Sequence, residues 1–266
     1  MKYKVGFIGC GNMASAIIGG LISKSGISPM EIIASDASEE ATKKAAETNG
    51  ICITNNNCAA AVDSEVLFLS VKPQFYETVI NEIKDILPAK QIIVTIAPGK
   101  TLEWLAERLG SDKKIVRTMP NTPALVGAGI TGVCKNDLVS DAEFTYVLSL
   151  LGSFGLAEAV PEALMDAVVS VSGSSPAYVF MFIEAMADAA VADGMPRAQA
   201  YKFAAQAVMG SAKMVLDTGK HPGELKDMVC SPAGTTIEAV RVLEEKGFRS
   251  SVMEAMKACT AKAKGL

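Results

Sequence analysis

The sequence has very little histidine, the commonest metal ligand and the usual partner of a catalytic nucleophile. Its 266 residues include one histidine, His221, and one tryptophan. The six cysteines form no CxxC pair and are spread along the chain. A zinc cluster, a disulfide scaffold and a Ser-His-Asp set are therefore not expected. Such cysteine usage is typical of a reduced protein, and we predict a cytoplasmic location.

The charged residues show no excess that points to a polyanionic partner. The 25 Lys and Arg against 29 Asp and Glu give a formal net charge of −4, without any run of five like charges. We therefore expect no nucleic acid and no membrane among the partners. The first apolar stretch is too short for a signal peptide, and Glu184 and Asp188 interrupt the apolar stretch Ala177–Met195. We expect no segment that spans a bilayer.

The first 160 residues contain an alternation of two hydrophobic periods. Short apolar runs predict strands at Lys4–Gly9, Glu31–Ser35, Val66–Ser70, Gln91–Ile96, Lys114–Met119 and Ile130–Cys134. Amphipathic stretches predict helices at Ala14–Lys24, Glu39–Asn49, Gln74–Leu87 and Leu102–Leu109. This alternation predicts an α/β fold, with a parallel sheet that helices cover on both faces.

The strand pattern stops at about Pro161. Helical periodicity then predicts helices at Ser175–Ala192, Arg197–Leu216 and Thr235–Glu245. We therefore predict two domains, residues 1–160 and an all-helical domain of residues 161–266. The segments Ala177–Ala192 and Ala198–Lys213 are rich in Ala and Met around most of their circumference, so they must be buried. A subunit interface explains this best, and burial in the monomer's own core is the alternative.

The loop Gly9–Ala14 has the pattern GxGxxA between the first predicted strand and the first predicted helix. The first glycine allows a tight turn, the second lets the backbone approach a pyrophosphate, and the small last residue packs helix on strand. N–H groups at the helix start then face the phosphates. The loop predicts a Rossmann-like dinucleotide-binding domain, and a merely tight strand–helix turn is the alternative.

Asp36 closes the second predicted strand, about 20 residues past the glycines, where an acidic residue usually holds the ribose of NAD. It would also repel the extra phosphate of NADP. Four residues nearby in the sequence could favour that phosphate instead: Ser35, Ser38, Lys43 and Lys44. Asp36 could equally cap a helix that begins at Ala37. The choice between NAD(H) and NADP(H) stays open.

Three further loops follow predicted strands and so lie at the carboxyl edge of the sheet, where ligands bind in such folds. They are Val71-Lys72-Pro73, Ala97-Pro98-Gly99 and Met119-Pro120-Asn121-Thr122-Pro123. The last loop, stiffened by two prolines, suits a wall beside a nicotinamide, although a plain connecting turn could have the same sequence.

The segment Pro222–Val240 closely resembles the C-terminal signature of pyrroline-5-carboxylate reductases, with its Ser-Pro-x-Gly-x-Thr loop before a helix. Four other segments occur in that family's order and spacing: Gly9–Ala14, Val71–Pro73, Met119–Pro123 and Ser172–Tyr178. The resemblance covers the whole chain. It departs at Ser175 and Ala233, where the family often has glycine.

The resemblance implies an N-terminal Rossmann domain and a C-terminal helical domain that interlocks with a second subunit, with the active site at their interface. The implied reaction transfers hydride from NADPH or NADH to the C=N carbon of Δ1-pyrroline-5-carboxylate, which gives L-proline as the last step of proline biosynthesis. The expected partners are this cyclic imine and further copies of the chain, in a homodimer or larger homo-oligomer. Because the protonated imine is already electrophilic, the protein mainly aligns donor and acceptor.

The expected cofactor contacts are Gly9, Cys10, Gly11, Asn12, Met13, Ser35, Asp36, Asn57, Val71, Lys72, Pro98 and Asn121. The expected substrate contacts are Glu162, Ser231, Gly234, Thr235 and Thr236. Because Pro232 has no N–H, the N–H groups of the last three are the expected donors to the substrate carboxylate at this helix start.

Individual roles follow from the resemblance, each with an alternative. It places the Thr236 hydroxyl, the expected catalytic group, against the substrate nitrogen, whereas a threonine there could also cap the helix. It places Glu162 near the ring nitrogen, whereas by itself Glu162 is an ordinary first-turn helix acid. His221 is expected to be a loop residue rather than a catalytic one.

Two other functions fit parts of the sequence. β-Hydroxyacid dehydrogenases share the Rossmann-plus-helical plan, but they use a lysine one helical turn beyond their GxxGxG segment. Here no lysine follows Ser172–Tyr178 until Lys202. A cofactor-binding regulatory module without turnover would have no use for the turn at Ser231–Thr236, and cofactor binding without imine reduction would indicate it.

Overall fold

A computed structural model describes residues 1–265 of the chain, which form two compact units. Unit 1 comprises residues 1–174 and the C-terminal segment from Cys259, and unit 2 comprises Ser175–Ala258. The predicted boundary after residue 160 falls inside unit 1, because Met165 packs with Met119 and Cys134 of the sheet. As a boundary between functional domains it stays a prediction.

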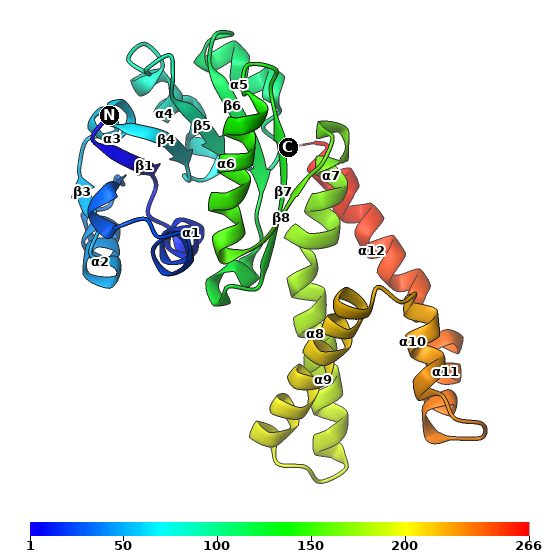
Figure 1. Cartoon of the computed structure of the whole chain (residues 1–266). Coiled ribbons are helices and arrows are strands. Elements are labelled where there is room, and N and C mark those ends of the chain that lie inside the picture. Colours follow the sequence, from blue (N-terminus) through cyan, green and yellow to red (C-terminus); the bar gives the residue numbers. More distant parts are fainter. Residues whose placement is uncertain (266) are drawn as a thin grey trace. The chain divides into compact units, whose positions relative to one another are not determined.

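Unit 1 is built on an eight-stranded sheet of order β3-β2-β1-β4-β5-β6-β7-β8 (Figure 1). The strands are β1 (Tyr3–Ile8), β2 (Ile32–Ser35), β3 (Cys52–Thr54), β4 (Ser64–Leu69), β5 (Ile92–Thr95), β6 (Lys114–Met119), β7 (Gly129–Lys135) and β8 (Gly155–Ala159). The six predicted strands are confirmed, whereas β3 and β8 were not predicted. The sheet is parallel except that β7 runs antiparallel to β6, because the connection between them is too short for a crossover.

Helices cover both faces of this sheet, as predicted. They are α1 (Asn12–Lys24), α2 (Glu39–Asn49), α3 (Asn57–Val62), α4 (Tyr76–Ile83), α5 (Leu102–Leu109), α6 (Asp141–Leu151) and α7 (Met165–Val168). Successive strand side chains point to opposite faces. In β4, Val66 and Phe68 therefore join the core beneath α1 and α6, whereas Leu67 and Leu69 join the core beneath α4 and α5.

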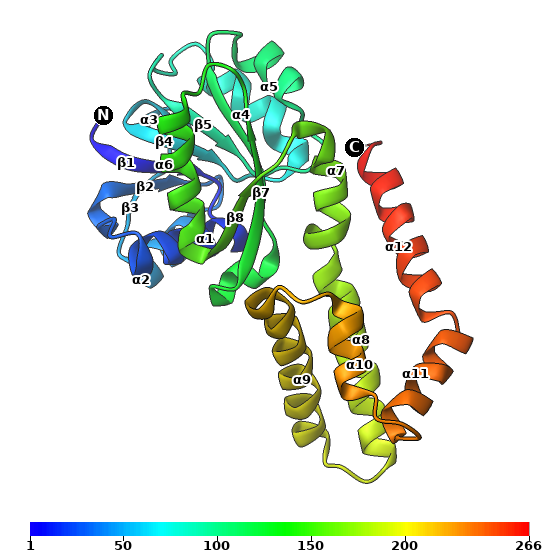
Figure 2. The same ribbon diagram turned by 45° about the vertical axis from the view of Figure 1, so that its right-hand side comes forward.

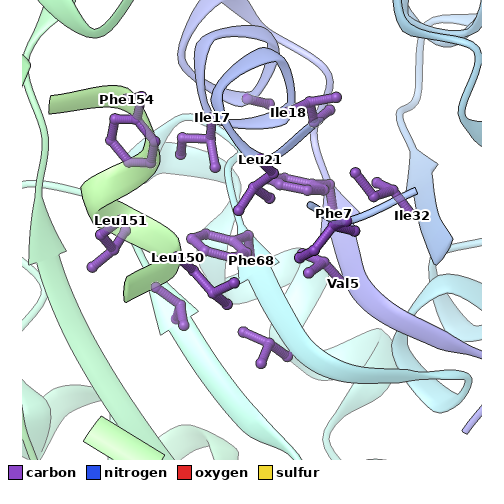
Figure 3. Close-up of a cluster of buried hydrophobic side chains, with 14 of the residues drawn as sticks. Val5, Phe7, Ile17, Ile18, Leu21, Ile32, Phe68, Leu150, Leu151 and Phe154 are labelled. Atoms are coloured by element: carbon purple, nitrogen blue, oxygen red, sulfur yellow. The ribbon is translucent and has the colours of Figure 1, made fainter. Parts of the chain in front are cut away.

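The first of these two cores is shown in Figure 3. The rings of Phe7 and Phe68 stack with centroids 4.9 Å apart, and α1 covers them with Ile17, Ile18 and Leu21, all fully buried. Each such side chain contributes about 1.5–3 kcal/mol by burial. Unit 1 therefore holds its glycine loop, which directly precedes α1, on a well-packed base.

The strand order places a topological switch at β1. This strand pairs with β2 on one side and β4 on the other, all parallel, so the connections from β1 and from β4 diverge. In open α/β sheets, ligands bind outside the carboxyl ends of the strands at such a point.

A long helical run leads out of unit 1. It passes from α7 through a π-helical turn, Val169–Gly173, into α8 (Ser175–Ala192). The run Glu162–Ala192 is long and apolar enough to cross a membrane by length and composition alone. This differs from the expectation that no segment would qualify, but soluble proteins contain helices of this kind, so it is weak evidence. The absence of a membrane partner stays a prediction.

Unit 2 is entirely helical (Figure 2). After α8 come α9 (Arg197–Thr218), α10 (Pro222–Val229), α11 (Thr235–Glu245) and α12 (Phe248–Ala263), whose last turns belong to unit 1. Helices α8 and α9 pack against each other. The predicted ranges of α8 and α11 are confirmed, whereas α10 and α12 were not predicted.

The apolar side chains of unit 2 are mostly exposed. Between residues 175 and 258, all within the described chain, the buried hydrophobic residues are Ala187, Ala200 and Ala204. Phe180 is 63% exposed and Phe203 is 61% exposed. Burial of α8 and α9 in the monomer's own core, the alternative left open above, is therefore wrong.

Candidate functional site

The switch point in unit 1 carries a cleft of about 350 Å³. It is lined by residues that follow β1, β2 and β4, by the start of α3 and by one face of α4: Ile8, Gly9, Gly11, Asp36, Ala37, Asn57, Ser70, Val71, Lys72, Phe75, Thr78, Val79 and Glu82. Six of the predicted cofactor residues are thereby brought together, although they come from four separate segments of the chain.

The glycine loop has the geometry that its sequence predicts. Gly9 has φ +105°, and a Cβ there would lie 2.7 Å from the backbone of Ser70, so no other residue fits. Gly11 differs, because no atom lies within 4 Å of where its Cβ would project. It precedes α1 as a cap without a side-chain hydrogen bond, so the N–H groups of Asn12 and Met13 stand at an open helix start. The open space and the helix start together suit a phosphate group.

Asp36 lines the cleft from the end of β2. Its Oδ2 accepts a hydrogen bond from the N–H of Cys10 (2.7 Å), and its Oδ1 accepts one from the N–H of Ser38 (2.9 Å). The alternative role as a helix cap is wrong, since α2 begins at Glu39 and its cap is Ser38, whose hydroxyl accepts from Ala41 N–H. The carboxylate instead joins the glycine loop to the segment after β2.

Ser35 lies beneath the cleft rather than in it. It is fully buried, and its hydroxyl donates to Oδ1 of Asn57 at 2.8 Å. The amide of Asn57 in turn donates to Oε2 of Glu82 at 2.7 Å. This chain of hydrogen bonds fixes the orientation of Asn57 at the start of α3, so Ser35 acts by positioning it.

Glu82 belongs to a set of cleft residues that were not predicted from the sequence. Phe75, Thr78, Val79 and Glu82 stand at positions i, i+3, i+4 and i+7, which is one face of a helix. That spacing, directly after the loop Val71–Pro73, is a signal that could have identified them.

Pro98 and Asn121 are not among the residues that line the cleft. Asn121 is buried and holds three segments together: its amide donates to Ser172 O (3.1 Å), and its Oδ1 accepts from Ile130 N–H (2.9 Å). Ser172 belongs to the π-helical turn, a feature common at functional sites. Cofactor contacts by Pro98 and Asn121 stay predictions.

The Cys10 thiol is not a reactive group in this loop. Burial, with Asp36 alongside, raises the pKa of Cys10 to about 12, and its Sγ contacts Ser35 O at 3.6 Å. Its backbone N–H, rather than its thiol, takes part in the site.

In unit 2, four of the five predicted substrate residues lie in the turn before α11 or in its first helical turn. The N–H of Gly234 donates to Ser231 O at 3.0 Å, which closes the turn. Gly234 then caps α11 without a side-chain hydrogen bond. The Gly234 N–H, one of the three expected anion donors, is thus already engaged, and the N–H groups of Thr235 and Thr236 lie in the first helical turn. The cap alternative for Thr236 is wrong, since it is the second helical residue.

Ala233 makes this turn unusual. It has φ +56°, the one positive φ outside glycine among the described residues. An L-residue in the left-handed region is strained by roughly 1–2 kcal/mol. The resembling family often has glycine at this position. Alanine therefore keeps the same turn at an energetic cost.

Glu162 forms a partly buried ion pair in unit 1. Its Oε1 accepts from Arg117 Nη1 (2.8 Å) and from the N–H of Leu102 (2.7 Å), at the start of α5. Arg117 is almost fully buried. Burial, and to a lesser extent Glu162, raises the pKa of the nearby Cys134 thiol to about 12. Glu162 therefore anchors the chain after β8, and it does not line the cofactor cleft.

His221 has a structural position. It caps α10, and its Nδ1 accepts a hydrogen bond from Gly223 N–H at 3.0 Å. This agrees with its expected role as a loop residue.

Comparison with known proteins identifies relatives of both units. The family model "Pyrroline-5-carboxylate reductase dimerisation" matches residues 162–266, and the model "NADP oxidoreductase coenzyme F420-dependent" matches residues 4–99. Pyrroline-5-carboxylate reductase of Escherichia coli is 56% identical over 266 residues, covering 100% of this chain and 99% of that protein.

Solved structures give the same relationship over the whole chain. A pyrroline-5-carboxylate reductase from Coxiella burnetii has a TM-score of 0.92 at 34% identity, covering 100% of this chain and 98% of that one. The pyrroline carboxylate reductase of Plasmodium falciparum, solved with NADP bound, has a TM-score of 0.90 at 32% identity with the same coverage.

Proposed function

Because the chain belongs to the pyrroline-5-carboxylate reductase family, we propose that it reduces the C=N bond of Δ1-pyrroline-5-carboxylate to give L-proline. The observation that carries the proposal is the 56% identity with the E. coli reductase over all 266 residues. That identity spans both the glycine loop of unit 1 and the turn before α11 in unit 2.

The cleft at the end of β1 suits a nicotinamide dinucleotide. Gly11 leaves space for a pyrophosphate, the N–H groups of Asn12 and Met13 can donate to it, and Asp36 can accept from a ribose hydroxyl. Lys72 adds a cation to the cleft wall. A bound NADH or NADPH supplies the hydride.

The turn before α11 suits the substrate's carboxylate. Thr235 and Thr236 present N–H groups at a helix start, where an anion is stabilised without a buried cation. The hydroxyl of Thr236 is then the group that meets the substrate nitrogen. Both donors to Glu162 bind its Oε1, so Oε2 is the oxygen through which Glu162 could contact the ring nitrogen.

The exposed apolar faces of α8 and α9 support a homodimer. Large apolar side chains that stay exposed on two packed helices indicate an interaction site, and residues 162–266 match a dimerisation model. A second copy of the chain would cover Phe180 and Phe203. Cytoplasmic location and assembly of dimers into a larger homo-oligomer remain part of the proposal.

The test is the loss of reduced-nicotinamide absorbance with Δ1-pyrroline-5-carboxylate, run with NADH and with NADPH. Consumption with either cofactor, and formation of proline in equal amount, is the expected result. A folded protein that binds cofactor but consumes neither would instead be a regulatory module, and the proposed reaction would be wrong.

A further inference from the structure

We propose that this chain selects NADH over NADPH, and that Asp36 makes the selection. The inference rests on the proposed function, because it presumes a nicotinamide dinucleotide in the cleft of unit 1.

Both carboxylate oxygens of Asp36 accept hydrogen bonds. One carboxylate oxygen accepts from the N–H of Cys10 in the glycine loop, and the other accepts from the N–H of Ser38 before α2. The side chain is therefore held from two sides while it lines the cleft. An acidic residue so placed at the end of the second strand accepts from a ribose 2′-hydroxyl.

A 2′-phosphate of NADPH would need hydrogen-bond donors at the same place. Backbone N–H groups before a helix are common phosphate donors, but the N–H of Ser38 already donates to the carboxylate of Asp36. The carboxylate of Asp36, itself an anion, thus occupies the place where the 2′-phosphate would accept this hydrogen bond. A second anion there would meet a like charge, and such contacts are costly.

Three of the four residues that could favour the phosphate, Ser35, Ser38 and Lys43, are otherwise engaged. Ser35 is fully buried and bonded to Asn57, the Ser38 hydroxyl caps α2, and Lys43 pairs with Glu39 at 3.3 Å. Lys44 follows an acidic first turn formed by Glu39 and Glu40. The cation that does line the cleft, Lys72, follows β4 rather than β2.

The test is direct binding of NADH and NADPH, followed by reduced-nicotinamide fluorescence, in the full chain. We expect the Kd for NADH to be lower by about tenfold or more, as expected for one unfavourable like-charge contact. Asp36→Ser should move the ratio of the two Kd values about tenfold toward NADPH. Asp36→Asn, which keeps the size of the side chain and removes its charge, should move it in the same direction.

Glu40→Gln is the matched control, since it removes a negative charge from the same helix start without altering a cleft residue. It should leave the ratio unchanged, and a shift equal to that of the Asp36 variants would overturn the inference. So would equal or tighter NADPH binding by the unaltered chain, or an unchanged ratio in both folded Asp36 variants. Tight NADPH binding with imine reduction would leave the proposed function standing, whereas binding of neither cofactor would overturn both.

Discussion

The two units bury their apolar side chains in different ways. In unit 1, β4 alternates Val66 and Phe68 toward one helical layer with Leu67 and Leu69 toward the other, and all four are buried. In unit 2, α8 and α9 carry large apolar residues that stay exposed in the single chain. A sheet covered on both faces completes its own core, whereas helices that are apolar on most sides need a further surface to cover them.

The largest expected effect comes from placing a charge on that uncovered surface. Phe203→Glu on α9 should convert the proposed homodimer to a monomer and abolish imine reduction, because an unpaired carboxylate is costly to bury. Sedimentation velocity and the absorbance assay would measure both. Met30→Glu in unit 1, at a residue 66% exposed, is the control and should change neither. A Phe203→Glu protein that stays dimeric would show that this face is not the interface.

The next effect tests whether the turn of unit 2 takes part in the chemistry. Thr236→Ala should lower kcat/KM by about 10²-fold, as for loss of one polar active-site contact. Cofactor binding, a property of unit 1, should be unchanged in the fluorescence titration. Thr235→Ser keeps a hydroxyl and the backbone N–H at the neighbouring position and serves as the control. A loss smaller than twofold would exclude a chemical role for the Thr236 hydroxyl.

A smaller effect tests the strain in the same turn. Ala233→Gly should stabilise the chain by up to about 1 kcal/mol, since glycine relieves the left-handed strain but loses more entropy on folding. Chemical denaturation would measure the change. Ala239→Gly, in the ordinary helical backbone of α11, is the control and should destabilise. Destabilisation by Ala233→Gly would mean that the positive φ carries no strain.

The last effect depends on pH and contrasts a partly buried ion pair of unit 1 with an exposed ion pair of unit 2. Lys114, with Ser140 N–H, lowers the pKa of Glu143 to about 2. A depressed carboxyl pKa stabilises the fold above the usual value near 4.5 and loses this as the pH falls toward 2. Glu143→Gln should therefore cost about 1 kcal/mol at neutral pH and nothing near pH 2. Glu238→Gln, in the exposed pair with Arg241, should show a smaller pH dependence in thermal unfolding.

Much of the fold was predictable because its signals are local. The runs Glu39–Asn49, Leu102–Leu109 and Thr235–Glu245 are helices at the predicted residues, since periodicity and end residues act within a few positions. The strands β3 and β8 were missed because Cys52–Thr54 is very short and Gly155–Ala159 is mostly exposed. Their pairing with β2 and β7, rather than their own composition, makes them strands.

The candidate site divides in the same way. The glycine loop was predictable, because the GxGxxA pattern requires a positive φ at Gly9 and open space beside Gly11, and the structure has both. The way in which Asp36 is held was not predictable, since it accepts a hydrogen bond from Cys10, 26 positions away. Neither was the pair of Arg117 and Glu162, 45 positions apart.

The strands and helices with strong periodicity, the dinucleotide loop and the resemblance that predicts imine reduction can all be recognised in the sequence. The elements and the loop depend on residues near one another in the chain, and the resemblance depends on short segments in a fixed order. Three features could be seen only in the folded chain. Asp36 accepts a hydrogen bond from the glycine loop instead of capping α2, and the N–H of Gly234 donates within its own turn. The apolar side chains of α8 and α9 remain exposed in one copy of the chain. These depend on which distant groups meet, and a hydrogen bond or a buried surface forms only between groups that the fold brings into contact.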